Sequence, residues 1–281
     1  IISLGEEYQD AASRHIDECT KAAERMRSGL IYLQNDAQAN RAFQLANYAI
    51  LLQQICSRRE LRKANYDNAV KRYIFSTIYQ APNPLQTDTN RGNWRAFQVA
   101  FLLMSIQSTA EGDIPERSTV ELIWFPTGGG KTEAYLGLSA FALFMRRLKN
   151  REDAGVNVLM RYTLRLLTAQ QFQRASALIC AMEYLRRQNE NELGKEPFSI
   201  GIWVGRETTP NTRTDAISKF NRLQRDSSAE NPFLISRCPW CAAQMGRYQE
   251  KLPKGIPNSL YVLGYNQSRG TVIFKCPDNA C

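Results

Sequence analysis

The chain has 281 residues, which is enough for one large domain or two modest domains with hydrophobic cores of their own. Hydrophobic residues make up 43% of the sequence, and it contains neither an apolar run of about 18 residues nor a signal peptide, so we expect a cytoplasmic protein without membrane spans. The excess of 36 lysines and arginines over 27 aspartates and glutamates favours a polyanionic partner, although a basic soluble surface would have the same composition.

The N-terminal segment is expected to be helical. Apolar residues recur at steps of four and three from Tyr8 to Leu33 and form one stripe of a long amphipathic helix. After a break at residues 35–36, a second helix is expected to run to about Arg59. We interpret residues 1–80 as a helical N-terminal module that packs against the protein or docks a partner.

A glycine loop joins an apolar strand, which begins at Leu122, to a helix. Successive glycines let backbone N–H groups turn toward one phosphate, and the start of the helix adds its own unpaired N–H groups. Lys131 would reach the β- and γ-phosphates of ATP and the Thr132 hydroxyl would hold Mg²⁺, so we assign these two as the catalytic residues. The alternative is a glycine turn that happens to precede a lysine. The expected nucleotide-binding residues of the loop are Thr127, Gly128, Gly129, Gly130, Lys131, Thr132 and Glu133.

This loop resembles a helicase motif. Phe125 stands where a strict Walker A sequence has glycine, and the run matches the Pro-Thr-Gly-x-Gly-Lys-Thr variant of superfamily 2 helicases. In those helicases an upstream glutamine with an aromatic neighbour reads the adenine edge, and Gln98 beside Phe97 looks similar. The paired donor and acceptor of the amide suit N6 and N7 of adenine. Because the separation from Lys131 is longer than in the compact motif, a plain helix-surface glutamine remains the alternative.

Two further strand and helix units are expected after the helix that follows the loop. A strand over residues 155–160 leads into a segment that resembles helicase motif Ia, and a strand over residues 198–204 ends in a loop that resembles motif Ib. Alternation of strands and helices implies a parallel sheet, whose ligands bind at the carboxyl ends of the strands. In the alternative interpretation, the motif Ia residues cap and solvate their helix. The resemblance places these residues along the nucleic-acid path: Thr163, Arg165, Gln170, Gly205, Arg206, Thr209 and Asn211.

Four of the seven cysteines form two turns, Cys238-Pro-Trp-Cys241 and Cys276-Pro-Asp-Asn-Ala-Cys281. Two such turns facing each other supply four thiolates for tetrahedral Zn²⁺, on a ribbon whose expected strands are residues 260–264 and 271–275. An iron–sulfur cluster and a site without metal are the alternatives. The remaining cysteines lie singly in apolar helical contexts and are expected to be buried thiols: Cys19, Cys56 and Cys180.

The longest runs of resemblance are Trp124–Leu138 and Leu159–Gln171. Both look like a bacterial helicase subfamily that includes the helicase component of the DISARM anti-phage defence system. The resemblance implies an ATP-driven motor on DNA that is single-stranded or has a single-stranded end, working with a second protein subunit of a defence complex. The sequence does not distinguish DNA from RNA.

We therefore expect an α/β fold with a RecA-like P-loop NTPase parallel sheet over residues 90–230. A helical extension would precede it, and a zinc-ribbon insertion would occupy residues 233–281. The acidic pair and the arginine of a complete ATPase are not visible, and the chain begins with Ile1 and ends on a cysteine of the second turn. We expect the first motor half of a larger helicase, without the second RecA-like domain and without appreciable ATP turnover by itself. A nucleotide-dependent DNA clamp and a zinc-ribbon assembly platform remain alternatives.

Overall fold

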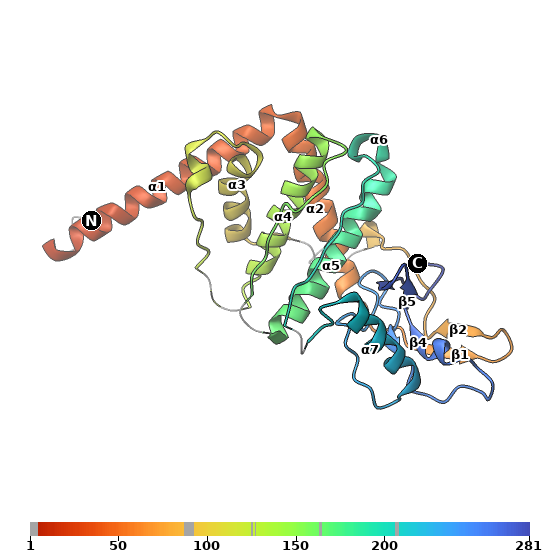
Figure 1. Ribbon diagram of the computed structural model, residues 1–281. Coiled ribbons are helices and arrows are strands. Elements are labelled where there is room, and N and C mark those ends of the chain that lie inside the picture. The colour runs from red at the N-terminus through yellow and green to blue at the C-terminus, as the bar shows by residue number, and fades with distance from the viewer. Residues whose placement is uncertain (1–4, 87–92, 125, 127, 163–164, 206–207) are drawn as a thin grey trace. The chain divides into compact units, whose positions relative to one another are not determined.

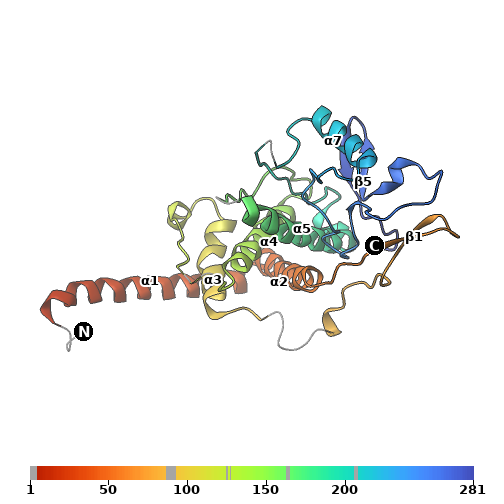
Figure 2. The same cartoon turned by 90° about the horizontal axis from the view of Figure 1, so that it is seen from below.

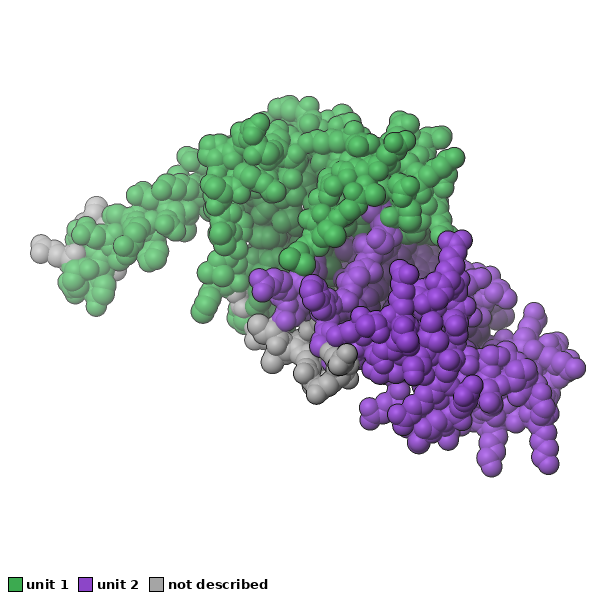
Figure 3. Space-filling model, viewed as in Figure 1, with its two compact units in different colours: residues 1–51, 89–159, 182–197 green, residues 52–88, 160–181, 198–281 purple. Residues whose placement is uncertain are grey.

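The computed structural model describes residues 5–86, 93–124, 126, 128–162, 165–205 and 208–281 (Figure 1). The chain divides into two compact units (Figure 3). Unit 1 comprises Ile1–Leu51, Thr89–Leu159 and Met182–Pro197, and unit 2 comprises Leu52–Asp88, Met160–Ala181 and Phe198–Cys281. In the described part of the chain, no helix is long and apolar enough to cross a bilayer.

Unit 1 is helical. Its elements are α1 (Glu6–Asn35), most of α2 (Ala37–Ser57), α3 (Ala96–Ala110), the short 3-10 helix η2 (Pro115–Ser118), α4 (Lys131–Lys149), the end of α5 (Arg165–Gln188) and α6 (Glu190–Leu193). The expected break between the first two helices is confirmed: the Asp36 carboxylate accepts a 2.7 Å hydrogen bond from the Ala39 N–H, as an N-cap does.

The core of unit 1 lies where α3 packs against both α1 and α4 (Figure 2). Gly29 of α1 permits the first crossing, because a Cβ there would lie 1.9 Å from the Leu103 carbonyl oxygen of α3. Fully buried Leu136, Phe141 and Phe144 of α4 fill the space between the helices. The N-terminal turns of α1 lie outside this core, so Cys19 is exposed and its expected burial is wrong. Cys56 is buried as expected, and Cys180 is half-buried.

All strands that the structure describes lie in unit 2, and all of them pair antiparallel. The three pairs are β1 (Ala64–Asp67) with β2 (Arg72–Phe75), β3 (Gly246–Arg247) with β4 (Val262–Leu263), and β5 (Tyr265–Ser268) with β6 (Thr271–Phe274). Helix α7 (Arg213–Arg225) packs against β6, and the 3-10 helices η1 (Pro84–Gln86) and η3 (Asn258–Tyr261) complete the unit.

The strand pair that leads into the second cysteine turn joins other residues than expected. Residues 271–274 pair with 265–268 and not with 260–264, which instead contribute β4. Arg269 and Gly270 have φ angles of 47° and 73°, the left-handed pair that a tight two-residue hairpin requires. This short turn brings the immediately preceding residues alongside β6.

The three segments that the sequence analysis expected as parallel strands carry no strand hydrogen bonds in the described residues. Their described residues are 122–124, 155–160 and 198–204. Several of their large apolar side chains are exposed: Leu122, Trp124, Val156, Leu159 and Trp203. A parallel strand needs a paired neighbour and helices on both faces. The RecA-like sheet therefore stays a prediction.

Candidate functional site

The glycine loop of unit 1 has the backbone that a phosphate cradle needs. Gly128 and Gly130 have φ angles of 82° and 90°, a region that side chains with a Cβ rarely adopt. Helix α4 starts at Lys131 directly after Gly130, so its unpaired N–H groups border the loop. The Lys131 ammonium donates a 3.3 Å hydrogen bond to the Pro126 carbonyl at the other end of the loop. The lysine thus folds back over its own loop.

The described parts of the loop bring together most of the expected nucleotide-site residues. Thr132 and Glu133 are half-buried in the first turn of α4, beside Lys131. Glycine at position 130 also permits a close contact, since a Cβ there would lie 2.8 Å from Nε2 of Gln98. Thr127 lies outside the described residues.

Gln98 holds this loop from the side. It is 4% exposed, so the alternative of a plain surface glutamine is wrong. Its Nε2 donates to the Gly130 carbonyl at 2.6 Å, and its Oε1 accepts the Arg95 N–H at 2.8 Å. Arg95 in turn donates to the Gly129 carbonyl at 2.7 Å. The start of α3 is therefore tied to the last two glycines of the loop, a link that the motif comparison missed. The contact of Gln98 with adenine stays a prediction.

The residues expected along the nucleic-acid path belong to unit 2. Thr163 and Arg206 lie outside the described residues, and Arg165 opens α5 without a described side chain. Gln170 is exposed on α5. The expected residues that lie in the loop before α7 are Gly205, Thr209 and Asn211; the Thr208 N–H bonds to the Gly205 carbonyl at 2.9 Å, which closes a turn. Their role in binding nucleic acid stays a prediction.

The four clustered cysteines come together in unit 2. Their sulfur atoms all lie within 4.8 Å of one another, and Sγ of Cys241 is 3.5 Å from Sγ of Cys276. A tetrahedral zinc with bonds of about 2.3 Å sets its sulfurs about 3.8 Å apart, so the donor set and its spacing fit Zn²⁺. Hydrogen bonds from the thiols of Cys241, Cys276 and Cys281 hold the pKa of Cys238 well below its usual value. A thiolate, the form that binds metal, is thus favoured at Cys238.

Each cysteine turn is shaped by its own backbone. In the first, the Cys238 N–H donates to the Ala243 carbonyl at 2.8 Å, and the Ala242 N–H donates back to the Cys238 carbonyl at 3.0 Å. In the second, the Cys281 N–H donates to the Asp278 carbonyl at 3.2 Å.

Arg62 joins the two cysteine turns, and the sequence analysis did not identify it. Its N–H donates to the Ala242 carbonyl, and its carbonyl accepts from the Gln244 N–H, both at 2.9 Å. Its guanidinium donates to the carboxylate of Asp278 at 2.7 Å. The side chains of this ion pair are 8% and 13% exposed. One buried arginine therefore anchors the first turn through its backbone and the second through its charge.

Comparison with known proteins found one relative that matches most of the chain. No family model matches it. It is 35% identical over 253 residues to the DISARM protein DrmA of Bacillus paralicheniformis (strain ATCC 9945a / NCIMB 11709 / CD-2), and the match covers 86% of this chain. The chain is related to a DISARM protein. The match covers 21% of DrmA, so the chain spans about a fifth of the length of this relative.

Proposed function

We propose that the chain is the ATP-binding part of a DNA-dependent ATPase, a helicase or translocase, that acts in anti-phage defence with a second protein subunit. The observation that carries the proposal is the loop from Pro126 to Lys131. It combines two left-handed glycines, a helix start and a lysine on one short stretch. The similarity to a DISARM protein supports the defence role.

In this proposal the loop residues bind the phosphates of ATP. Backbone N–H groups at the start of α4 donate to the phosphate oxygens, and Lys131 exchanges its bond with the Pro126 carbonyl for the β- and γ-phosphates. Thr132 supplies a hydroxyl ligand to Mg²⁺. Gln98 and Arg95 keep the glycine carbonyls turned away from the phosphates, because their donors bind those carbonyls.

The proposal is tested in the full-length protein. Lys131→Ala is expected to abolish ATP hydrolysis stimulated by single-stranded DNA, whereas Lys21→Ala, which removes an exposed lysine of α1, is expected to leave it unchanged. Calorimetry that finds no nucleotide binding by the wild-type protein contradicts the proposal and favours the assembly platform. ATP-tightened DNA binding without strand displacement or translocation favours the clamp.

Gln98→Ala separates two functions of this glutamine. If Gln98 holds the loop, the variant weakens binding of ATP and GTP by the same factor, because both share the triphosphate. If Gln98 reads adenine, only ATP binding weakens. From the two backbone bonds of the buried amide we expect the first result.

A further inference from the structure

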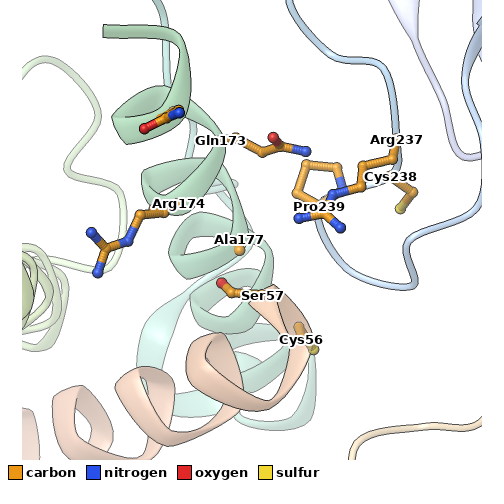
Figure 4. Close-up of a pocket in the computed structure, with 9 residues that line it drawn as sticks. Cys56, Ser57, Gln173, Arg174, Ala177, Arg237, Cys238 and Pro239 are labelled. Atoms are coloured by element: carbon orange, nitrogen blue, oxygen red, sulfur yellow. The ribbon is translucent and has the colours of Figure 1, made fainter. Parts of the chain in front are cut away.

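A cavity of about 240 Å³ opens in unit 2 beside the first cysteine turn (Figure 4). Its walls come from the end of α2, one face of α5 and the turn Arg237–Pro239. Since water occupies about 30 Å³ per molecule in the liquid, the cavity has room for roughly eight waters. This is enough for a phosphate group with part of its sugar.

The polar groups that line the cavity are mostly donors. Nε2 of Gln173 is fully buried and has no hydrogen-bond partner within the described part of the chain. Figure 4 shows this side chain extending from α5 toward the Arg237–Pro239 turn, whereas the guanidinium of Arg174 points away from it. Ser57 adds a hydroxyl, and exposed Gln170 adds a second amide.

Arg237 supplies positive charge to the cavity, and the thiolate of Cys238, which belongs to the cysteine cluster, is its anionic neighbour in the lining. Arg237 is held in place by a 3.2 Å bond from its Nη1 to the Arg59 carbonyl, and within the described residues its other nitrogens are left for a ligand. Among the described residues that line the cavity there is no aspartate or glutamate. Burial raises the pKa of the Cys56 thiol in the wall to about 12, so this group is neutral at physiological pH. A cation surrounded by amide and hydroxyl groups, without a competing carboxylate, suits an anion.

We propose that this cavity binds a phosphate group of single-stranded nucleic acid. The inference rests on the proposed function, and it adds a contact point between α5 and the cysteine turn. Arginine, amide and hydroxyl groups are the usual donors to phosphate oxygens and carry no base preference. Gln170 lies exposed at the edge of the cavity, which leaves the site open to a strand that continues beyond the bound phosphate. Metal binding by Cys238 would hold the neighbouring Arg237 in place.

The test measures binding of single-stranded oligonucleotides by the full-length protein at several salt concentrations. Arg237→Gln is expected to weaken binding about tenfold and to reduce the salt slope by about 0.7, the value for one phosphate contact on a single strand. Arg72→Gln removes an exposed arginine of β2 in the same unit and serves as the control with unchanged affinity and slope. Gln173→Leu changes a residue of α5 and none of the cysteine turn, and it is expected to weaken binding several-fold even if Arg237→Gln disturbs the cysteine cluster.

A scan with single methylphosphonate substitutions identifies the phosphate. One substituted position should weaken binding to the wild-type protein, and Arg237→Gln should lose that sensitivity. The proposal is wrong if both cavity variants bind like the wild type. It is also wrong if Arg237-dependent binding is seen with inorganic phosphate but not with oligonucleotides, since the source is then free phosphate.

The same variants separate this inference from the proposed function. Suppose that DNA stimulates ATP hydrolysis by the protein and that both cavity variants bind DNA like the wild type. This result overturns the inference about the cavity but not the proposed function. If the cavity variants bind DNA more weakly but the protein does not hydrolyse ATP, the ATPase proposal is wrong and phosphate binding by the cavity is supported.

Discussion

Replacement of Arg62 by methionine is expected to loosen both cysteine turns at once. The guanidinium donates to the Asp278 carboxylate at 2.7 Å and to the Thr77 carbonyl at 2.7 and 2.9 Å. Its Cζ lies 5.2 Å from the centroid of the Phe75 ring. Methionine keeps the contact with the ring but removes every donor. The carboxylate of Asp278 then loses its cation in a site where only 13% of the side chain is exposed.

The size of the effect follows from these contacts. Removing one partner of a buried ion pair costs about 3–5 kcal/mol. Asp278 keeps a 3.0 Å bond from the Ala280 N–H, so we expect the low end of this range, about 3 kcal/mol. Arg62→Lys keeps the charge but cannot bond to Thr77 and Asp278 in the same fork, and we expect an intermediate loss.

Hydrogen exchange followed by mass spectrometry measures this loss locally, in protein saturated with Zn²⁺. Amides of residues 238–245 and 276–281 should exchange about 10²-fold faster in Arg62→Met, because 1.4 kcal/mol corresponds to a factor of ten. Arg72→Met removes an exposed arginine of β2 in the same unit and is the control without a change. Unchanged protection of both cysteine turns in Arg62→Met would refute the reasoning.

Three further predictions concern packing, pH and metal. Gly29→Ala is expected to destabilise unit 1 by about 3 kcal/mol in denaturant unfolding, because its Cβ would lie 1.9 Å from a backbone oxygen, whereas Gly112→Ala, with open space around it, should change little. Burial raises the pKa of Cys56 from 9.0 to about 12, so the folded state keeps a proton that the unfolded state releases; stability should be unaffected below pH 9 and fall between pH 9 and 12, and Cys56→Ala should flatten this decline. Cys281→Ser is expected to lower zinc affinity by more than about tenfold in competition with a chelator, and an unchanged affinity, like that expected of Cys19→Ser, would contradict the four-thiolate site.

The helices could be predicted because their signals are local. The apolar period of α1, the break at Asp36 and the helix that follows the glycine loop depend on residues within a few turns of one another. The same holds for the cysteine turns, since two cysteines a few residues apart bend the chain through bonds within the turn. For these elements the sequence was sufficient.

Which residues meet across the chain was decided by the tertiary structure. Gln98 carries the residue type of an adenine reader, but burial of its amide against Gly130 is visible only once α3 is packed. Arg62 and Asp278 are 216 positions apart, and no pattern near either residue indicates the pair. Local periodicity specifies which face of an element is apolar, whereas the choice among possible partners depends on how the chain returns, and this is decided by packing and by the pairing of buried polar groups.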